Sequence, residues 1–61
     1  MEGTLTITID LENDAFQDAY GNLEIASILE RIVREYKTDT AIERPLRDFN
    51  GNTVGQIAIR R

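Results

Sequence analysis

Residues 4–9 read Thr-Leu-Thr-Ile-Thr-Ile, a strict alternation of polar and apolar side chains. Five of these six residues are β-branched, and branched side chains fit the pleated, half-buried surface of a β-strand. Because successive side chains of a strand point to opposite faces, we expect Leu5, Ile7 and Ile9 to face the core and the three threonines to face outward. The stretch therefore predicts a strand and indicates which face of its sheet a helix must cover.

Residues 10–21 predict a connector with one helical turn. Asn13 or Asp14 is suited to cap a turn that continues to Ala19, and the glycine at position 21 is suited to end it. We expect Phe16 and Tyr20 to anchor the connector on the core.

The main helix is predicted over residues 23–36, with Asn22 as its N-cap and Glu24 in its first turn. Apolar side chains recur there at helical spacing, which indicates one wide apolar stripe. They are Ile25, Ile28, Leu29, Ile32, Val33 and Tyr36. Residues 38–40, Thr-Asp-Thr, predict the loop that leaves the helix.

The last third of the chain predicts a β-hairpin. Asn50-Gly51 is the strongest two-residue hairpin signal, and it lies between a strand that starts at Pro45 and a return strand over residues 52–60. A two-residue turn places Leu46 opposite Gly55, although a glycine inside a strand also suggests a bulge that would shift this register by one. The register assigns Leu46, Ile57 and Ile59 to one face and Phe49, Val54 and Ala58 to the other.

The predicted fold class is α+β, with the order β-α-β-β in a single domain over residues 1–61. The hairpin makes the second and third strands antiparallel neighbours. One helix returns the chain, so the first strand pairs best beside the third, and we expect a three-stranded antiparallel sheet of order 2-3-1. The main helix covers one face and leaves the other open. We expect the open face, a candidate dimer interface, to carry Thr4, Thr6, Thr8, Val54 and Gln56.

Composition narrows the range of functions. The 61 residues include no cysteine and no histidine, which excludes disulfides and the usual thiolate or imidazole zinc sites. The net charge of −4 argues against direct binding of nucleic acid, which needs a basic surface. No apolar run is long enough to span a membrane and no signal peptide precedes the first strand, so we expect a cytoplasmic protein. Because so short a chain buries only about 60% of its unfolded surface, we expect a homodimer.

Two acidic stretches have the composition of calcium loops, but neither fits. Residues 10–14 read Asp-Leu-Glu-Asn-Asp, yet a calcium loop needs glycine at its sixth position and glutamate at its twelfth, where this chain has Ala15 and Gly21. Residues 48–52 are explained by the chemistry of a turn. We expect no metal and no cofactor.

Nothing in the chain predicts catalysis. Ser27 is the only serine and has no histidine to activate it, and no carboxylate has the neighbouring apolar pocket that acid–base catalysis needs. A pocket that encloses a substrate is also hard to build from about sixty residues. We therefore expect that this is not an enzyme.

Charge is polarised along the chain, because the acids crowd residues 10–24 while four arginines lie on the hairpin strands. An acidic surface steers association with a basic protein partner, and a solvated surface that only maintains solubility is the alternative. The arginines are Arg44, Arg47, Arg60 and Arg61. The candidate partner-binding residues are Glu12, Asp14, Asp18 and Glu24, with the open sheet face as the other candidate contact.

Three blocks of sequence carry a resemblance. They are residues 13–16 (Asn-Asp-Ala-Phe), 24–29 (Glu-Ile-Ala-Ser-Ile-Leu) and 46–55 (Leu-Arg-Asp-Phe-Asn-Gly-Asn-Thr-Val-Gly). Together they resemble small, mostly uncharacterised accessory proteins encoded by bacteriophages and prophages. The resemblance covers nearly the whole chain, and its most specific part is the last block, a pattern that a hairpin also needs. It supplies no catalytic residues.

The resemblance implies a function by binding. Small acidic phage accessory proteins often inhibit host proteins, including anti-phage defence systems, by stoichiometric occlusion in the host cytoplasm. The alternative is a small virion structural or assembly protein that acts by self-association. A third hypothesis is a site for a small ligand at a dimer interface, where a phosphate would need the hairpin arginines.

Overall fold

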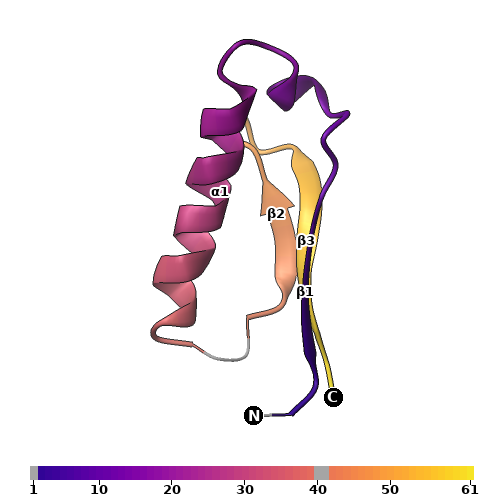
Figure 1. Cartoon of the computed structure of the whole chain (residues 1–61), viewed down its shortest axis with the longest axis vertical. Coiled ribbons are helices and arrows are strands. Elements are labelled where there is room, and N and C mark those ends of the chain that lie inside the picture. The colour runs from indigo at the N-terminus through magenta and orange to yellow at the C-terminus, as the bar shows by residue number, and fades with distance from the viewer. Residues whose placement is uncertain (1, 40–41) are drawn as a thin grey trace.

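The chain folds into a three-stranded antiparallel sheet with one long helix across one face (Figure 1). This computed structural model describes residues 2–39 and 42–61, so the predicted exit loop ends at Thr40, outside the described residues. The strand order is β1-β3-β2, which confirms the predicted α+β class and topology. The elements are β1 (Thr4–Ile9), the 3₁₀ helix η1 (Asp14–Phe16), α1 (Gly21–Tyr36), β2 (Arg44–Arg47) and β3 (Thr53–Arg60).

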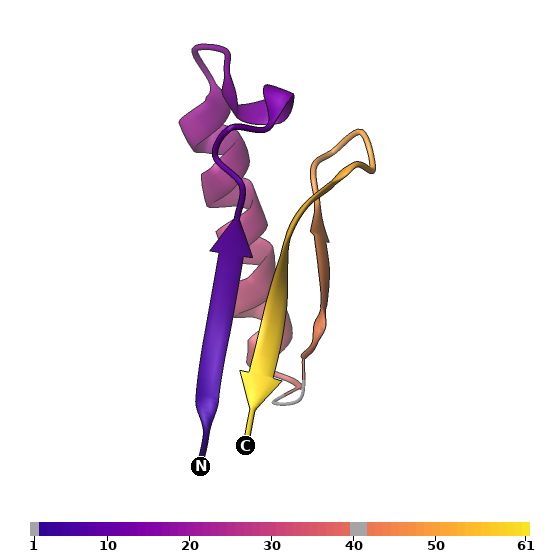
Figure 2. The ribbon, with the colours of Figure 1, turned by 90° about the vertical axis from the view of Figure 1, so that its right-hand side faces the viewer.

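The strand β1 pairs with β3 over its whole length, but the helix covers it only in part. Figure 2 shows α1 crossing behind the sheet at an angle, from the β1 side at its start toward the β2 side at its end. Ile9 packs against the core, whereas Leu5 and Ile7 remain 43% and 40% exposed. The three side chains therefore lie on the α1 side of the sheet as predicted, but only Ile9 packs against the core, because the oblique helix leaves the first half of the strand uncovered.

The hairpin between β2 and β3 turns through three residues and not through two. The N–H of Gly51 donates to the carbonyl of Asp48 at 3.0 Å, and the N–H of Asp48 donates to the carbonyl of Asn52 at 2.9 Å. Gly51 has a φ of +88°, whereas Asn50 does not have a positive φ. A two-residue type I′ turn needs a positive φ at both central residues, so that prediction is wrong. The loop is a type I turn followed by a left-handed glycine.

A β-bulge in β3 restores the register that the longer loop shifts. Leu46 lies opposite Gly55 and Arg47 lies opposite Thr53, so Val54 is an extra residue on β3. The third loop residue moves the pairing by one position and the extra residue moves it back, which is why the predicted Leu46–Gly55 pair is confirmed. The bulge also interrupts the alternation of faces. Val54 is consequently 2% exposed and part of the core, which corrects its assignment to the open face.

Among the described residues, six buried apolar side chains form the core between α1 and the sheet. They are Ile28 and Ile32 from α1, Ile42, Leu46 from β2, and Val54 and Ile57 from β3. Tyr36 packs against this cluster while partly exposed, as its place on the predicted stripe suggests. Leu29 and Val33, predicted on the same stripe, are exposed. The buried strand residues of the core belong to β2 and β3, so α1 buries the part of its stripe that faces those two strands.

The connector from β1 to α1 follows the prediction in its first half. Asn13 caps η1, since its Oδ1 accepts a hydrogen bond from the N–H of Ala15 at 3.0 Å. Phe16 packs against the core as expected. Tyr20 is exposed, so the prediction that it is a second anchor is wrong.

The helix α1 begins two residues earlier than predicted. Gly21 is its first residue, and Tyr20 occupies the N-cap position without a side-chain capping bond, so the predicted Asn22 cap is wrong. A Cβ on Gly21 would lie 2.2 Å from the carbonyl oxygen of Phe16. Glycine is therefore needed here because the helix starts against the backbone of the connector.

Candidate functional site

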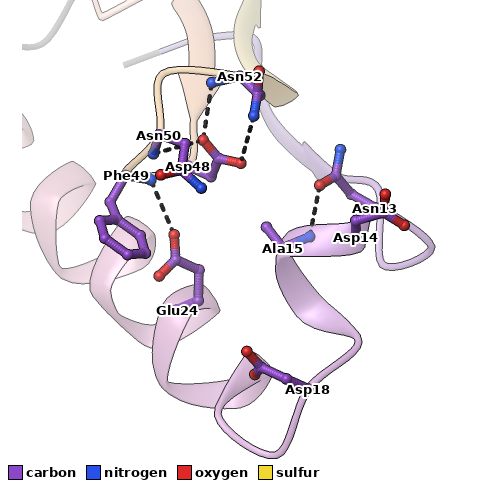
Figure 3. Close-up of a pocket in the computed structure, with 9 residues that line it drawn as sticks. All are labelled: Asn13, Asp14, Ala15, Asp18, Glu24, Asp48, Phe49, Asn50 and Asn52. Atoms are coloured by element: carbon purple, nitrogen blue, oxygen red, sulfur yellow. Dashed lines mark hydrogen bonds between the residues drawn. The ribbon is translucent and has the colours of Figure 1, made fainter.

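An open cleft lies at the end of the molecule where the connector, the start of α1 and the hairpin loop meet (Figure 3). Its volume is about 570 Å³. The lining residues are Asn13, Asp14, Ala15 and Asp18 from the connector, Glu24 from α1, and Asp48, Phe49, Asn50 and Asn52 from the hairpin loop. Segments that are far apart in the sequence thus form one surface.

Hydrogen bonds to the backbone hold the connector wall of the cleft. The N–H of Asp10 donates to the carbonyl of Val54 at 2.8 Å, which ties the start of the connector to β3. Asp18 accepts a hydrogen bond from the N–H of Tyr20 at 2.8 Å, just before the helix begins. Within the described part of the chain, no group donates a hydrogen bond to the carboxylate of Asp14. Asp14 is exposed, so its carboxylate is open to solvent.

Asp48 organises the loop wall of the cleft. Its Oδ1 accepts hydrogen bonds from the N–H groups of Asn50 and Asn52, each at 2.9 Å. The side-chain amide of Asn52 donates to its Oδ2 at 3.4 Å, and the residue is only 5% exposed. This carboxylate therefore serves the shape of the loop, and the loop holds Phe49 outward with 83% of its surface exposed.

Glu24 joins the two walls of the cleft. It lies in the first turn of α1, and its Oε1 accepts a hydrogen bond from the N–H of Phe49 at 3.1 Å. A carboxylate in this position also interacts favourably with the positive end of the helix dipole. The contact holds the backbone of Phe49 against the start of α1, and the exposed ring lies on the Glu24 side of the cleft (Figure 3).

The cleft lies at the negative end of the molecule. Five of the eleven acids and none of the seven basic residues lie in residues 10–24, so the excess negative charge of the chain is concentrated there. Two arginines of the hairpin strands are engaged within the fold. Arg44 donates to Glu35 through Nε at 3.1 Å, and Arg47 donates to the carbonyl of Gly51 at 3.0 Å. The C-terminus, where Arg60 and Arg61 lie, is at the opposite end (Figure 1).

The structure brings together three of the four acids proposed as partner-binding residues. Asp14, Asp18 and Glu24 all line the cleft. Glu12 is on the same connector but is not among the lining residues, and its backbone N–H donates to Asp10 at 3.0 Å. Of the residues assigned to the open sheet face, Thr4, Thr6, Thr8 and Gln56 are exposed and Val54 is buried.

Sequence reasoning missed the contribution of the hairpin loop. Turn chemistry accounts for Asp48, Asn50 and Asn52, which removed them from the search for a site. The signal that could have identified the loop is Phe49, a large aromatic residue between polar turn residues. Such a ring is unusual in a tight exposed turn, where the favoured residues are small and polar.

Comparisons with family models, with curated proteins and with solved structures found no match to this chain. In residues 2–39 and 42–61, no group of three or more carboxylates is arranged to hold a metal ion. Within the same residues, no helix has the length and apolar character that crossing a bilayer requires.

Proposed function

We propose that this chain is a non-catalytic binding protein that inhibits a partner protein by stoichiometric occlusion, with the acidic cleft receiving a basic segment of that partner. The observation that carries the proposal is the pairing of clustered carboxylates with the 83% exposed ring of Phe49 on one cleft. Aromatic residues supply much of the binding energy of protein interfaces, and charge complementarity gives specificity and a fast association rate.

The chemistry of the cleft favours arginine or lysine in the partner. Asp14 and Asp18 present carboxylates at its wall, and charge-assisted hydrogen bonds to a guanidinium group are stronger than neutral ones. The ring of Phe49, on the Glu24 side of the cleft, offers a face to a cation, an interaction that contributes about 0.5–1 kcal/mol at an exposed site. A basic segment that spans the cleft would thus gain charge contacts at the connector wall and an aromatic contact at the loop wall.

The resemblance to phage accessory proteins supports a host protein as the target. An inhibitor that works by occlusion needs a surface and no catalytic group, in keeping with a chain of 61 residues that lacks cysteine and histidine. Anti-phage defence proteins of the host are the proposed class of target, and the cytoplasm of the host cell is the proposed location.

A pull-down from bacterial host lysate tests the proposal with two matched variants. Asp14→Lys and Glu12→Lys make the same change in charge on the same connector, but only Asp14 lines the cleft. We expect the wild type and the Glu12→Lys variant to capture one partner protein in stoichiometric amount, and the Asp14→Lys variant to capture none. The captured partner should elute when the salt concentration is raised. Equal loss in both variants, or no partner for the wild type, would contradict the proposal.

One observation favours the second candidate, a virion structural or assembly protein. The strand β1 lies at an edge of the sheet and is exposed along most of its length, as a self-associating strand needs. Mass spectrometry of purified phage particles separates the two candidates, because an inhibitor should be absent from the particle and an assembly protein should be present in many copies.

A further inference from the structure

Within residues 2–39 and 42–61, the strand β1 presents unpaired backbone groups at the edge of the sheet. In the order β1-β3-β2 of these residues, its only neighbour is β3. The N–H of Asp10 points to β3, where it donates to the carbonyl of Val54. Because backbone groups alternate in direction along a strand, Leu5, Ile7 and Ile9 turn their N–H and C=O groups toward the open edge.

This edge lacks the features by which proteins usually prevent strand pairing. Thr4–Ile9 contains no charged residue and no proline. The other edge strand, β2, has only four residues, includes Pro45 and begins and ends with an arginine. Beyond its start, the carboxylate of Glu43 accepts the N–H of Ile59 at 3.0 Å. One edge of the sheet is therefore protected and the other is free.

An apolar groove runs beside the free edge on the side of the sheet that carries α1. Its volume is about 390 Å³, and its lining residues are Leu5, Ile7, Ile32, Val33, Tyr36 and Lys37. Val33 is 55% exposed, and Ala26 and Leu29 precede it at helical spacing and are exposed as well. The free edge and this helical stripe offer backbone and apolar contacts at the same place.

The sequence of the edge is complementary to itself. If two copies of β1 pair antiparallel around Ile7, Leu5 of each lies opposite Ile9 of the other, and the two Ile7 residues face each other. Thr6 lies opposite Thr8 on the other face. Apolar residues thus meet apolar residues and threonines meet threonines, with no like charges opposed within the strand. A second copy satisfies all of these contacts at once.

We propose that two copies of this chain pair through β1 around a two-fold axis near Ile7. The pairing joins the two sheets into a single sheet of six antiparallel strands. Both helices then lie on the same face, and the apolar grooves meet across the axis. A stable interface buries about 800 Å² on each partner, roughly a sixth of the 4708 Å² surface of this chain. The strand edge and the exposed stripe Ala26–Val33 are the surfaces that this dimer would bury.

Sedimentation from micromolar to millimolar concentration tests the dimer. We expect the wild-type protein to sediment with a mass of twice 6.9 kDa, the mass of one chain. Val33→Lys should raise the dimer dissociation constant at least about a hundredfold, because a charge would enter the centre of the interface. Leu23→Lys is the matched control, since Leu23 is an apolar residue of α1 that is about as exposed as Val33 but does not line the groove. A monomeric wild type, or a Val33→Lys variant that dimerises as the wild type does, overturns the proposal.

Cysteine cross-linking tests the register, and the absence of native cysteine makes it specific. Thr6 and Thr8 are exposed, so neither substitution should disturb the fold. We expect a mixture of Thr6→Cys and Thr8→Cys to form disulfide-linked dimers at least about tenfold faster than either variant alone, because directly opposed residues have the closest Cβ atoms. Equal rates in all three samples overturn the pairing around Ile7.

Discussion

The backbone N–H of Phe49 donates a hydrogen bond of 3.1 Å to Oε1 of Glu24 across 25 positions of the sequence. This contact joins the hairpin loop to the first turn of α1, and both residues line the cleft. The shape of the cleft therefore depends on a bond between two elements that are not neighbours in the chain.

Replacing the acceptor of this bond should destabilise the fold modestly. We expect Glu24→Ala to lower the free energy of unfolding by about 0.5–1.5 kcal/mol, since it loses the hydrogen bond. Glu24→Gln keeps an acceptor oxygen and should retain most of the stability. Urea unfolding of the two variants measures the difference. Equal losses would instead assign the effect to the negative charge at the start of the helix.

Asp48 should matter more to stability than its place in a loop suggests. We expect Asp48→Ala to cost about 1–3 kcal/mol, because the N–H groups of Asn50 and Asn52 lose their partner in a part-buried turn. Asp48→Asn keeps one acceptor oxygen and should cost less. Thermal unfolding gives the stabilities, and faster hydrogen exchange at these two amides should accompany the alanine substitution. Unchanged exchange would contradict this role.

Gly21→Ala should destabilise the protein, although alanine in a helix is usually better than glycine by about 0.5–1 kcal/mol. The reason is the approach of Phe16, whose carbonyl oxygen would lie 2.2 Å from the new Cβ. We expect a loss of about 1–3 kcal/mol, the usual cost of overpacking. Ser27→Ala, on the exposed side of the same helix, is the control and should be neutral or slightly stabilising. Denaturant midpoints decide, and a stabilised Gly21→Ala would be the contrary result.

Leu46 and Phe49 are three residues apart but should respond in opposite ways to alanine. Leu46 is buried in the core, so Leu46→Ala should cost about 2–5 kcal/mol, most of the stability expected for a domain of this size. Phe49→Ala should change stability by less than about 0.5 kcal/mol and should still weaken capture of the partner. Circular dichroism and a quantitative pull-down separate the two effects. A Phe49→Ala variant that unfolds would show that the ring serves the fold.

Much of the fold could be predicted because its strongest patterns are local. The alternation in residues 4–9 and the helical spacing from Ile25 to Tyr36 each predict one element, and short connections leave few topologies. The hairpin was harder, because Asn50-Gly51 fits turns of two lengths. The longer loop and the bulge at Val54 have opposite effects on register, so the pairing was correct while the face of Val54 was wrong.

The candidate site could be predicted only in part, since it depends on the packing of distant segments. The cluster of acids in residues 10–24 indicated the right end of the molecule. It could not indicate that Asp14 lines the cleft while Glu12 does not, because that difference depends on how the connector folds against the hairpin loop. The contribution of Phe49 depends on its contact with Glu24, which no local pattern encodes.

One wall of the cleft comes from residues 13–18 and the other from residues 48–52, so the cleft exists only in the folded chain. A peptide that spans residues 10–24 alone should have almost no affinity for the proposed partner, even though it carries five of the eleven acids. Conversely, a partner bound as proposed would contact both walls and hold the hairpin in place. At a free partner concentration of a hundred times the dissociation constant, binding would add about 2.7 kcal/mol to the free energy of unfolding of this domain.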